Sequence, residues 1–214
     1  MKRIAAVAGL ALLGIVLAAM ALTTRAADPA RGPDVLIIHA AGTPFAEADR
    51  FTPANVDAVS CPTPVALNCK TVAERAAEAL RAKPLDVRVV EASEIKNRRQ
   101  LLEPRAVVLA SPTYFGTASW KMHKLIHEQL WQFFALGGKR LEGRLFATIV
   151  TGRTEGPANQ CVGVLQGAVK SCNGTVGPSL VVLIGQKPEE VAERAAKFAD
   201  DLAAKLAAKP DETP

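Results

Sequence analysis

The single tyrosine of this chain stands beside a phenylalanine in the segment Ser111-Pro112-Thr113-Tyr114-Phe115-Gly116-Thr117. The segment follows the apolar run 106–110, which is typical of a buried strand. Two aromatic rings in a loop at the end of such a strand are suited to stacking on a flat ligand. The alternative is that Tyr114 and Phe115 only cover the edge of a sheet.

A second group of polar residues lies just downstream, where His123 and His127 are one helical turn apart. This spacing suits a metal ion only if a third ligand converges on the pair, and no acidic residue follows at a suitable position. Trp120 and Trp131 fall on nearly the same side of the predicted helix. We therefore predict no metal site here, and expect a packing face or a face between copies of the chain.

Other catalytic motifs are absent from the sequence. It contains no Gly-x-Ser-x-Gly elbow and no phosphate loop ending in Gly-Lys-Ser/Thr. Its carboxylates are scattered over predicted helix surfaces, for example at Glu74, Glu78 and Glu193, where solvation explains them. Hydrolase and nucleotidase functions are therefore disfavoured.

Five short runs rich in Val, Ile and Leu predict buried parallel strands, at 35–39, 87–90, 106–110, 145–150 and 180–184. Helical patterns alternate with them. A capping box, Thr71-Val72-Ala73-Glu74, predicts a helix to about residue 82, and further helices are expected at 94–102, from 118 to Gly137-Gly138, at 160–171 and at 188–206. The pattern predicts one doubly wound α/β domain with helices on both faces of the sheet.

Ligands of such domains bind beyond the carboxyl ends of the strands, so the loops after residues 39, 110, 150 and 184 are the candidates for a site. The connection from His39 to Lys70 is much longer than usual between a strand and a helix. Long loops of this kind tend to be functional.

The segment from Ser111 to Gly116, followed by Met122-His123-Lys124-Leu125, resembles flavodoxin-like proteins of the FMN-binding NAD(P)H quinone reductase and FMN reductase group. The resemblance implies a flavodoxin-like fold, with a three-layer, five-stranded parallel sheet of strand order 2-1-3-4-5. It also implies that this segment wraps the ring and ribityl chain of FMN, while the end of the fourth strand approaches the pyrimidine side of the ring. The implied flavin contacts are Pro112, Thr113, Tyr114, Phe115, Gly116, Thr151 and Gly152.

The phosphate turn departs from this family, in which a compact turn leads straight into the first helix. Here Gly42 and Thr43 remain, but residues 44–67 separate them from the helix start. A helix amino terminus offers amides and a positive dipole to an anion, and a lysine adds a point charge. We therefore expect Lys70 and Thr71, together with Gly42 and Thr43, to bind the phosphate.

The sequence begins with Lys2 and Arg3, an uncharged stretch at 4–22 and the small residue Ala26, which together predict a signal peptide over 1–26. Cleavage there removes Lys2, Arg3 and Arg25 and lowers the formal charge from +5 to +2, so nucleic acid is not expected as a partner. The predicted protein is periplasmic or secreted, with a linker at 27–33, the domain at 34–208 and a tail at 209–214. The alternative is an uncleaved inner-membrane anchor at 4–22.

Export makes disulfides the default for Cys61, Cys69, Cys161 and Cys172. If 160–171 is a helix, Cys161 and Cys172 are separated by roughly 16 Å along its axis, too far for a bond that needs alpha carbons within about 7 Å. We therefore predict a Cys61–Cys69 disulfide that restrains the long loop.

The function expected from these observations is noncovalent FMN binding and electron transfer by an exported protein. The resemblance implies a nicotinamide-driven quinone reductase, an FMN-dependent oxidoreductase. Because no soluble nicotinamide pool is expected outside the cytoplasm, electron exchange with a redox partner protein or a quinone is the stronger expectation. The alternative is a flavin-free binding module whose long loop, 40–70, presents a partner surface.

Overall fold

The computed structural model describes residues 32–40, 68–135, 141 and 143–208. The chain divides into two units, 1–31 and 32–214, and every described residue belongs to the second. The predicted signal peptide and anchor, Gly42, Thr43, Cys61, the Gly137-Gly138 helix end and the tail lie outside the described residues. Among the helices that are described, none is both long and apolar enough to cross a bilayer.

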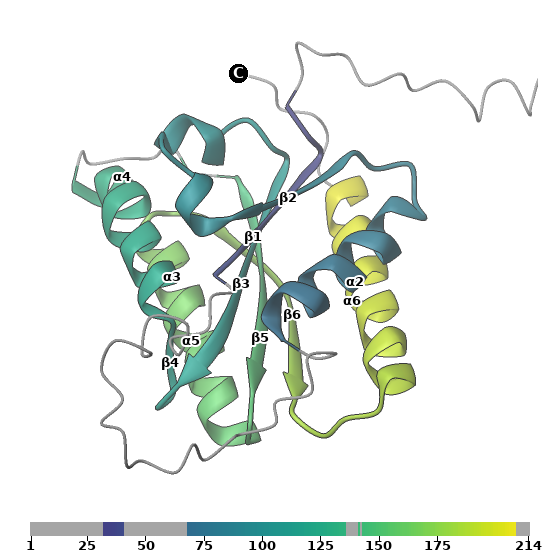
Figure 1. Ribbon diagram of the computed structural model, residues 1–214. Helices are drawn as coiled ribbons and strands as arrows, with labels where there is room; N and C mark the ends of the chain where they lie inside the picture. Colours follow the sequence, from purple (N-terminus) through teal and green to yellow (C-terminus); the bar gives the residue numbers. More distant parts are fainter. Residues whose placement is uncertain (1–31, 41–67, 136–140, 142, 209–214) are drawn as a thin grey trace, which may run out of the picture. The chain divides into compact units, whose positions relative to one another are not determined.

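Five parallel strands form the centre of the domain, and their order is β2-β1-β3-β5-β6 (Figure 1). Numbered along the chain, this is the predicted order 2-1-3-4-5, and the flavodoxin-like fold class is confirmed. The strands are β1 (Val35–His39), β2 (Val87–Glu91), β3 (Ala106–Tyr114), β5 (Leu145–Gly152) and β6 (Thr175–Leu183). A two-residue strand, β4 (Thr117–Ala118), pairs antiparallel with the end of β3.

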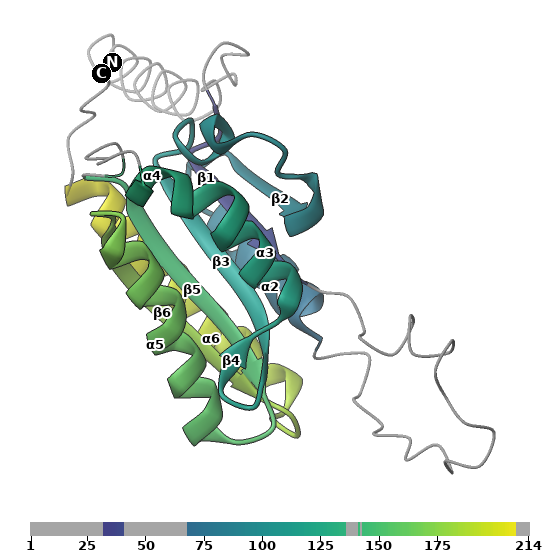
Figure 2. The ribbon, with the colours of Figure 1, turned by 90° about the vertical axis from the view of Figure 1, so that its left-hand side faces the viewer.

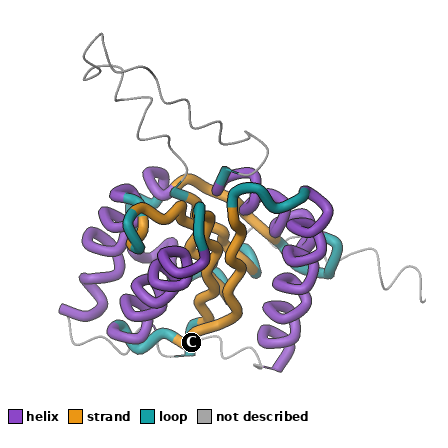
Figure 3. Tube along the Cα trace, turned by 90° about the horizontal axis from the view of Figure 1, so that it is seen from below, coloured by secondary structure: helices purple, strands orange, loops and turns teal. Residues whose placement is uncertain are grey.

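Helices cover both faces of the sheet, as Figure 3 shows in the view onto the carboxyl ends of the strands. On one face, α2 (Cys69–Arg81) and α6 (Pro188–Ala208) bury a cluster that includes Val72, Leu80 and Phe198. On the other face, α5 (Glu155–Ser171) packs beside a composite helix, and this second cluster includes Met122, Leu165 and Phe146. The composite helix consists of α3 (Trp120–Leu125), the π-helical turn η5 (Ile126–Leu130) and α4 (Trp131–Ala135).

Several element boundaries differ from the prediction because side-chain caps decide them. Helix α2 begins two residues before the predicted capping box, since Asn68 is its cap and accepts from the Thr71 amide at 2.8 Å. The helix predicted at 94–102 is wrong. That segment forms two 3₁₀ turns, η3 (Ala92–Glu94) and η4 (Arg98–Leu101), because Asn97 caps a new turn and accepts from the Arg99 amide at 2.9 Å.

Two further differences concern α5 and β6, which both begin about five residues earlier than predicted. Gly156 and Pro157, treated as loop in the sequence, lie in the first turn of α5, where proline is well tolerated. Strand β6 extends back to Thr175 through Gly177 and Pro178, and its pairing with β5 shifts register between Phe146 and Thr148. Proline is acceptable there because β6 is an edge strand of the sheet.

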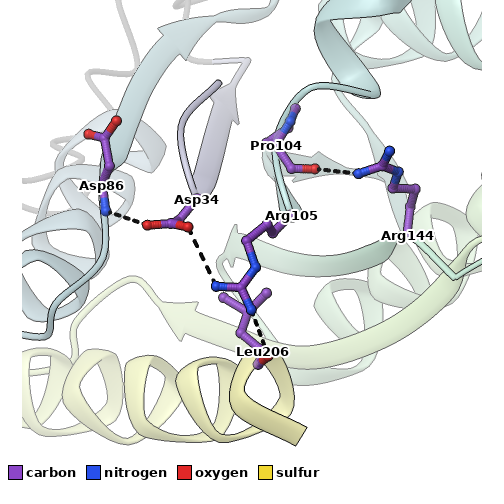
Figure 4. A network of polar contacts seen from close by, with 6 residues as sticks. All are labelled: Asp34, Asp86, Pro104, Arg105, Arg144 and Leu206. Carbon is purple, nitrogen blue, oxygen red and sulfur yellow. Dashed lines mark hydrogen bonds and ion pairs between the residues drawn. The ribbon is translucent and has the colours of Figure 1, made fainter. Parts of the chain in front are cut away.

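A polar network ties the chain together at the amino ends of the strands (Figure 4). Asp34 accepts from the Asp86 amide at 3.0 Å and faces Arg105, whose Nη1 lies 3.5 Å from the carboxylate. Arg105 also donates to the Leu206 carbonyl at the end of α6. The network therefore joins β1, the start of β3, the segment before β2 and the last turn of α6.

Candidate functional site

Three side chains form a row where β1, β3 and β5 end, on the face covered by α2. Alternation along a strand places every second residue on the same face. Because Ile37, Ala110 and Ile149 belong to the core under α2, His39, Tyr114 and Thr151 fall on that same face. The chain order reverses between β1 and β3, which makes this edge the topological switch point where ligands of open α/β sheets bind.

Cys69, the first residue of α2, lies beneath this row. It is buried, and its thiol interacts with the Thr151 side chain and the Ala40 backbone. Burial, with a smaller contribution from the thiol of Cys161, raises the pKa of Cys69 to about 12. The thiol therefore stays protonated at neutral pH and adds no charge beneath the row of site side chains.

The direction of the Cys69 side chain also corrects the disulfide prediction. Cys69 is a free thiol buried in the core between α2 and the sheet, which contradicts the predicted Cys61–Cys69 disulfide. Cys161 and Cys172 are free as well, and the intact α5 helix separates them as predicted. Cys69 directly follows Asn68, a good helix cap, and this position could have indicated a residue at the start of a helix. From the sequence we instead interpreted Cys69 as half of a disulfide.

The amino terminus of α2 contains the two predicted phosphate ligands that the structure describes. Both the amide and the hydroxyl of Thr71 donate to Asn68 Oδ1, at 2.8 and 3.1 Å. Lys70 is exposed, and its Nζ lies 3.8 Å from Glu74. Lys70 is therefore placed to add charge near the end of β1, whereas Thr71 is already engaged in capping.

The predicted aromatic loop is a β-hairpin. Strand β3 continues to Tyr114 and pairs back with Thr117 of β4, which leaves Phe115 and Gly116 as a two-residue turn. Their φ values, 52° and 82°, are those of a type I′ turn, in which both central residues are left-handed. Phe115 is fully exposed at the tip.

Tyr114 is partly buried, and this burial, together with the neighbouring Cys69, raises the pKa of its phenol. The phenol therefore stays neutral at physiological pH. Gly116 is favoured by its positive φ of 82°, and the end of the Gln160 side chain of α5 lies against it. The hairpin is thus seated against α5, beyond the carboxyl end of the sheet (Figure 2).

Thr113 and Gly152, two other predicted contacts, lie on the α5 face of the sheet. A Cβ on Gly152 would lie 2.7 Å from Cγ2 of Thr113, so no larger residue fits there. The Thr113 hydroxyl donates to the Thr117 and Pro157 carbonyls at 3.2 and 3.3 Å. Pro112 pairs with Thr151 in the ladder between β3 and β5. The structure therefore brings Pro112, Tyr114 and Thr151 together, and uses Thr113 and Gly152 to fix the hairpin on α5.

His39 is a site residue that the sequence reasoning missed. It is buried at the end of β1, and in the two ladders of β1 it pairs with Glu91 and Ala110. Burial lowers its pKa, as does Lys70 to a smaller extent, against the opposing effect of Glu91, Glu74 and Glu94. A histidine that ends a strand of an open sheet was a usable signal, since such positions border the ligand site.

The two downstream histidines have different surroundings. His123 Nε2 lies 2.7 Å from the Thr117 hydroxyl, so it supports β4, while His127 is exposed. Within the described part of the chain, no group of three His, Cys, Asp or Glu side chains converges. A groove of about 510 Å³ runs between α2 and α6, and the end-of-strand row does not line it.

The strand order and the site at the β1/β3 switch point define a flavodoxin-like α/β protein. The Flavodoxin family model matches residues 67–198, well over half of the sequence, and the chain therefore belongs to the flavodoxin family. The match begins at the start of α2, after the enlarged loop. No curated protein sequence matches the chain.

Solved structures agree with this fold. A flavodoxin from Streptococcus pneumoniae TIGR4 is 23% identical, with a TM-score of 0.58 over 80% of this chain and 98% of its own. A WrbA-like flavodoxin from Agrobacterium tumefaciens is 12% identical, with a TM-score of 0.56 over 83% of this chain and 100% of its own. The oxidised flavodoxin 1 of Bacillus cereus is 12% identical, with a TM-score of 0.58 over 79% of this chain and 97% of its own.

Proposed function

We propose that this protein binds FMN noncovalently at the carboxyl edge of β1, β3 and β5 and transfers electrons. The observation that carries the proposal is the convergence of Tyr114, Thr151 and Cys69 at the amino terminus of α2, at the switch point of a flavodoxin-family sheet. FMN, when bound, supplies the electron-accepting and electron-donating chemistry.

The residues present fit such a group. Tyr114 and the exposed Phe115 offer two aromatic surfaces for a flat ring. The amino terminus of α2 and Lys70 offer positive potential for a phosphate. Thr151 and Cys69 add neutral polar groups, and the raised pKa of both Tyr114 and Cys69 keeps the pocket floor uncharged.

The protein's part in this function is binding and tuning. Its side chains at the site are held in a protonated or neutral form, so none of them is set up as a nucleophile. A neutral, partly buried environment disfavours the addition of negative charge, whereas the dipole of α2 favours it. The balance of these two effects would set the reduction potential.

A titration with FMN and riboflavin tests the proposal. The purified protein should be yellow or become yellow with FMN, with absorbance near 450 nm as expected of oxidised flavin, and should bind FMN more tightly than riboflavin. Equal affinities would show that no phosphate site exists at the start of α2. A colourless protein that ignores both ligands would favour the flavin-free binding module, which gains some support from the family match beginning only at residue 67.

The finer parts of the proposal concern location and partners. We propose that the protein is exported and exchanges electrons with a redox partner protein or a quinone. The charge-free stretch at 4–22, preceded by Lys2 and Arg3, supports export. Mass spectrometry of the protein from cell fractions tests this, because cleavage after Ala26 gives a mature chain that begins at Ala27, whereas a retained anchor leaves the full chain in the membrane fraction.

A further inference from the structure

The outer face of the composite helix α3–η5–α4 carries aromatic side chains that the flavin site does not use. Trp120, Trp131 and Phe134 are 57%, 52% and 50% exposed, and the first two are the only tryptophans of the chain. The rings of Trp131 and Phe134 lie 4.8 Å apart. Together with Lys124, His127 and Glu128, which are also exposed, we call these residues the aromatic face.

The π-helical turn η5 lies in the middle of this face, between Trp120 and Trp131. Phe133 is buried, whereas Phe134 points outward and is half exposed. The turn is held in place by Cys172, whose thiol donates to the Leu130 carbonyl, and by Gln132, whose amide donates to the Glu128 carbonyl. The exposed rings therefore sit on a braced helix, and little order has to be gained when they bind a partner.

A groove of about 190 Å³ lies beside the first half of the helix. Trp120, Lys121, Lys124 and Glu128 form one wall, and the segment around η3, including Ile95, forms the other. The exposed Trp120 is among the residues that line it. An aromatic side chain from another molecule would find apolar contacts there, with charged groups at the rim.

The charged residues of the aromatic face can pair with the same residues of a second copy. Lys124 and Glu128 are each about half exposed, and their charged atoms lie 3.7 Å apart. If two copies of the helix pack antiparallel about a two-fold axis near residue 126, Lys124 of each copy faces Glu128 of the other. The same axis places Trp131 opposite residue 121, at the groove beside Trp120. A single two-fold axis thus pairs Trp131 with the groove and each lysine with a glutamate, as an isologous interface requires.

We propose that two copies of this chain form a symmetric dimer through the aromatic face, with Trp131 of each copy in the groove of the other. Helices Trp120–Ala135 span about 24 Å, and the three exposed rings contribute roughly 300 Å² per copy. A standard interface buries about 800 Å² per partner. The flanking charged residues and the groove must supply the rest, so the dimer is expected to be reversible, with dissociation in the micromolar range.

Sedimentation velocity of the purified protein over a concentration series, with or without flavin, tests the proposal. The wild type should shift from monomer to dimer as concentration rises. Trp131→Glu should raise the dissociation constant at least tenfold, as expected for an aromatic anchor. Ile184→Glu is the matched control, since Ile184 is another exposed apolar residue outside the face, and it should leave the dimer unchanged.

Charge reversals test the antiparallel geometry. Lys124→Glu alone and Glu128→Lys alone should each weaken self-association, because like charges then face each other. The double variant should restore it, and an equimolar mixture of the two single variants should form a mixed dimer. Lys197→Glu on α6 is the matched control.

Three results would overturn the proposal: a wild type that stays monomeric at all concentrations, a dimer insensitive to Trp131→Glu, or single variants that fail to associate on mixing. A monomer that binds lipid vesicles through Trp120 and Trp131 would also overturn it, in favour of a membrane-surface role. None of these measurements depends on flavin. A failure of the dimer proposal can therefore be distinguished from a failure of the proposed FMN binding.

Discussion

At the scale of single residues, the site combines groups that are kept neutral by burial. Cys69 and Tyr114 have raised pKa values and His39 a lowered one, so all three carry no charge at neutral pH. Lys70 and Glu91 supply opposite charges at the margin. A neutral interior beside a positive helix end is suited to a ligand with a flat ring and an anionic tail.

Replacing Tyr114 tests the ring contact directly. Tyr114→Ala should weaken FMN binding by about 1 to 3 kcal/mol, the scale of a lost aromatic stack. Tyr114→Phe keeps the ring and should retain most of the affinity, which separates stacking from any effect of the phenol hydroxyl. Fluorescence titration with FMN gives both values, and an unchanged dissociation constant for Tyr114→Ala would remove this residue from the site.

His39 should make the domain less stable in mild acid. Because burial lowers its folded-state pKa below the ordinary value of 6.5, protonation favours the unfolded chain. The stabilisation that neutral His39 gives the folded state is therefore complete above pH 6.5. It is lost as the pH falls from 6.5 toward the pKa of His39 in the folded state. Glu91 opposes this effect only in part, although its bond to Lys121 keeps its own pKa low and the carboxylate charged.

His39→Gln removes the titrating group and keeps a polar side chain. Urea unfolding at a series of pH values should show a shallower loss of stability below pH 6.5 for this variant than for the wild type. His123→Gln is the control, because His123 lies in the helix that follows the hairpin, away from the end of β1. Parallel pH profiles for wild type and His39→Gln would contradict the buried, neutral state of His39.

At the scale of elements, the β3–β4 hairpin holds a residue in a conformation that costs energy. A type I′ turn favours Asn-Gly, yet Phe115 occupies the first left-handed position at φ 52°. The left-handed region costs a residue such as phenylalanine roughly 1–2 kcal/mol. Such local strain in the hairpin of the proposed flavin site supports a functional reason for the exposed ring.

Phe115→Asn should therefore stabilise the domain by about 0.5–1 kcal/mol, since asparagine tolerates the left-handed region. The same variant should weaken FMN binding if the ring covers the flavin. Phe115→Leu, which keeps the strain and removes only the aromatic surface, is the control for stability. Thermal unfolding and FMN titration of both variants separate the two effects, and a destabilised Phe115→Asn would contradict the turn geometry.

At the scale of the whole domain, the polar network and the site lie at opposite ends of the strands. Asp34, at the start of β1, is held by Arg105 and the Asp86 amide, whereas His39 ends the same strand beside α2. The start of β1 therefore lies at the edge of the sheet away from the site.

Arg105→Ala should separate stability from binding. Losing its contacts with Asp34 and the Leu206 carbonyl should cost about 1.5–3 kcal/mol of unfolding free energy, as for hydrogen bonds to charged groups. FMN affinity should be unchanged because the two regions are distant and share no contact. Arg88→Ala, at an exposed position of β2, is the control. A large loss of FMN affinity in Arg105→Ala would contradict this separation.

The sequence by itself determined the strands, the sheet order through the family resemblance, and the aromatic segment at the site. These features depend on local patterns: runs of Val and Ile, and residues adjacent along the chain. Helix α6 was likewise predicted from Pro188 and the carboxylates after it. Local chemistry specifies such elements because their signals lie within a few residues of one another.

The tertiary structure alone decided where the elements end and which way the key side chains point. Strand β3 passes residue 110 because Ser111 and Pro112 find partners in Val150 and Thr151 of β5, far along the chain. The π-helical turn before Phe134 is bonded by the thiol of Cys172, which donates to the Leu130 carbonyl. Cys69 faces the sheet because α2 packs its first turn over β1 and β5. Each outcome rests on hydrogen bonds or packing between segments distant in sequence, which no local pattern records.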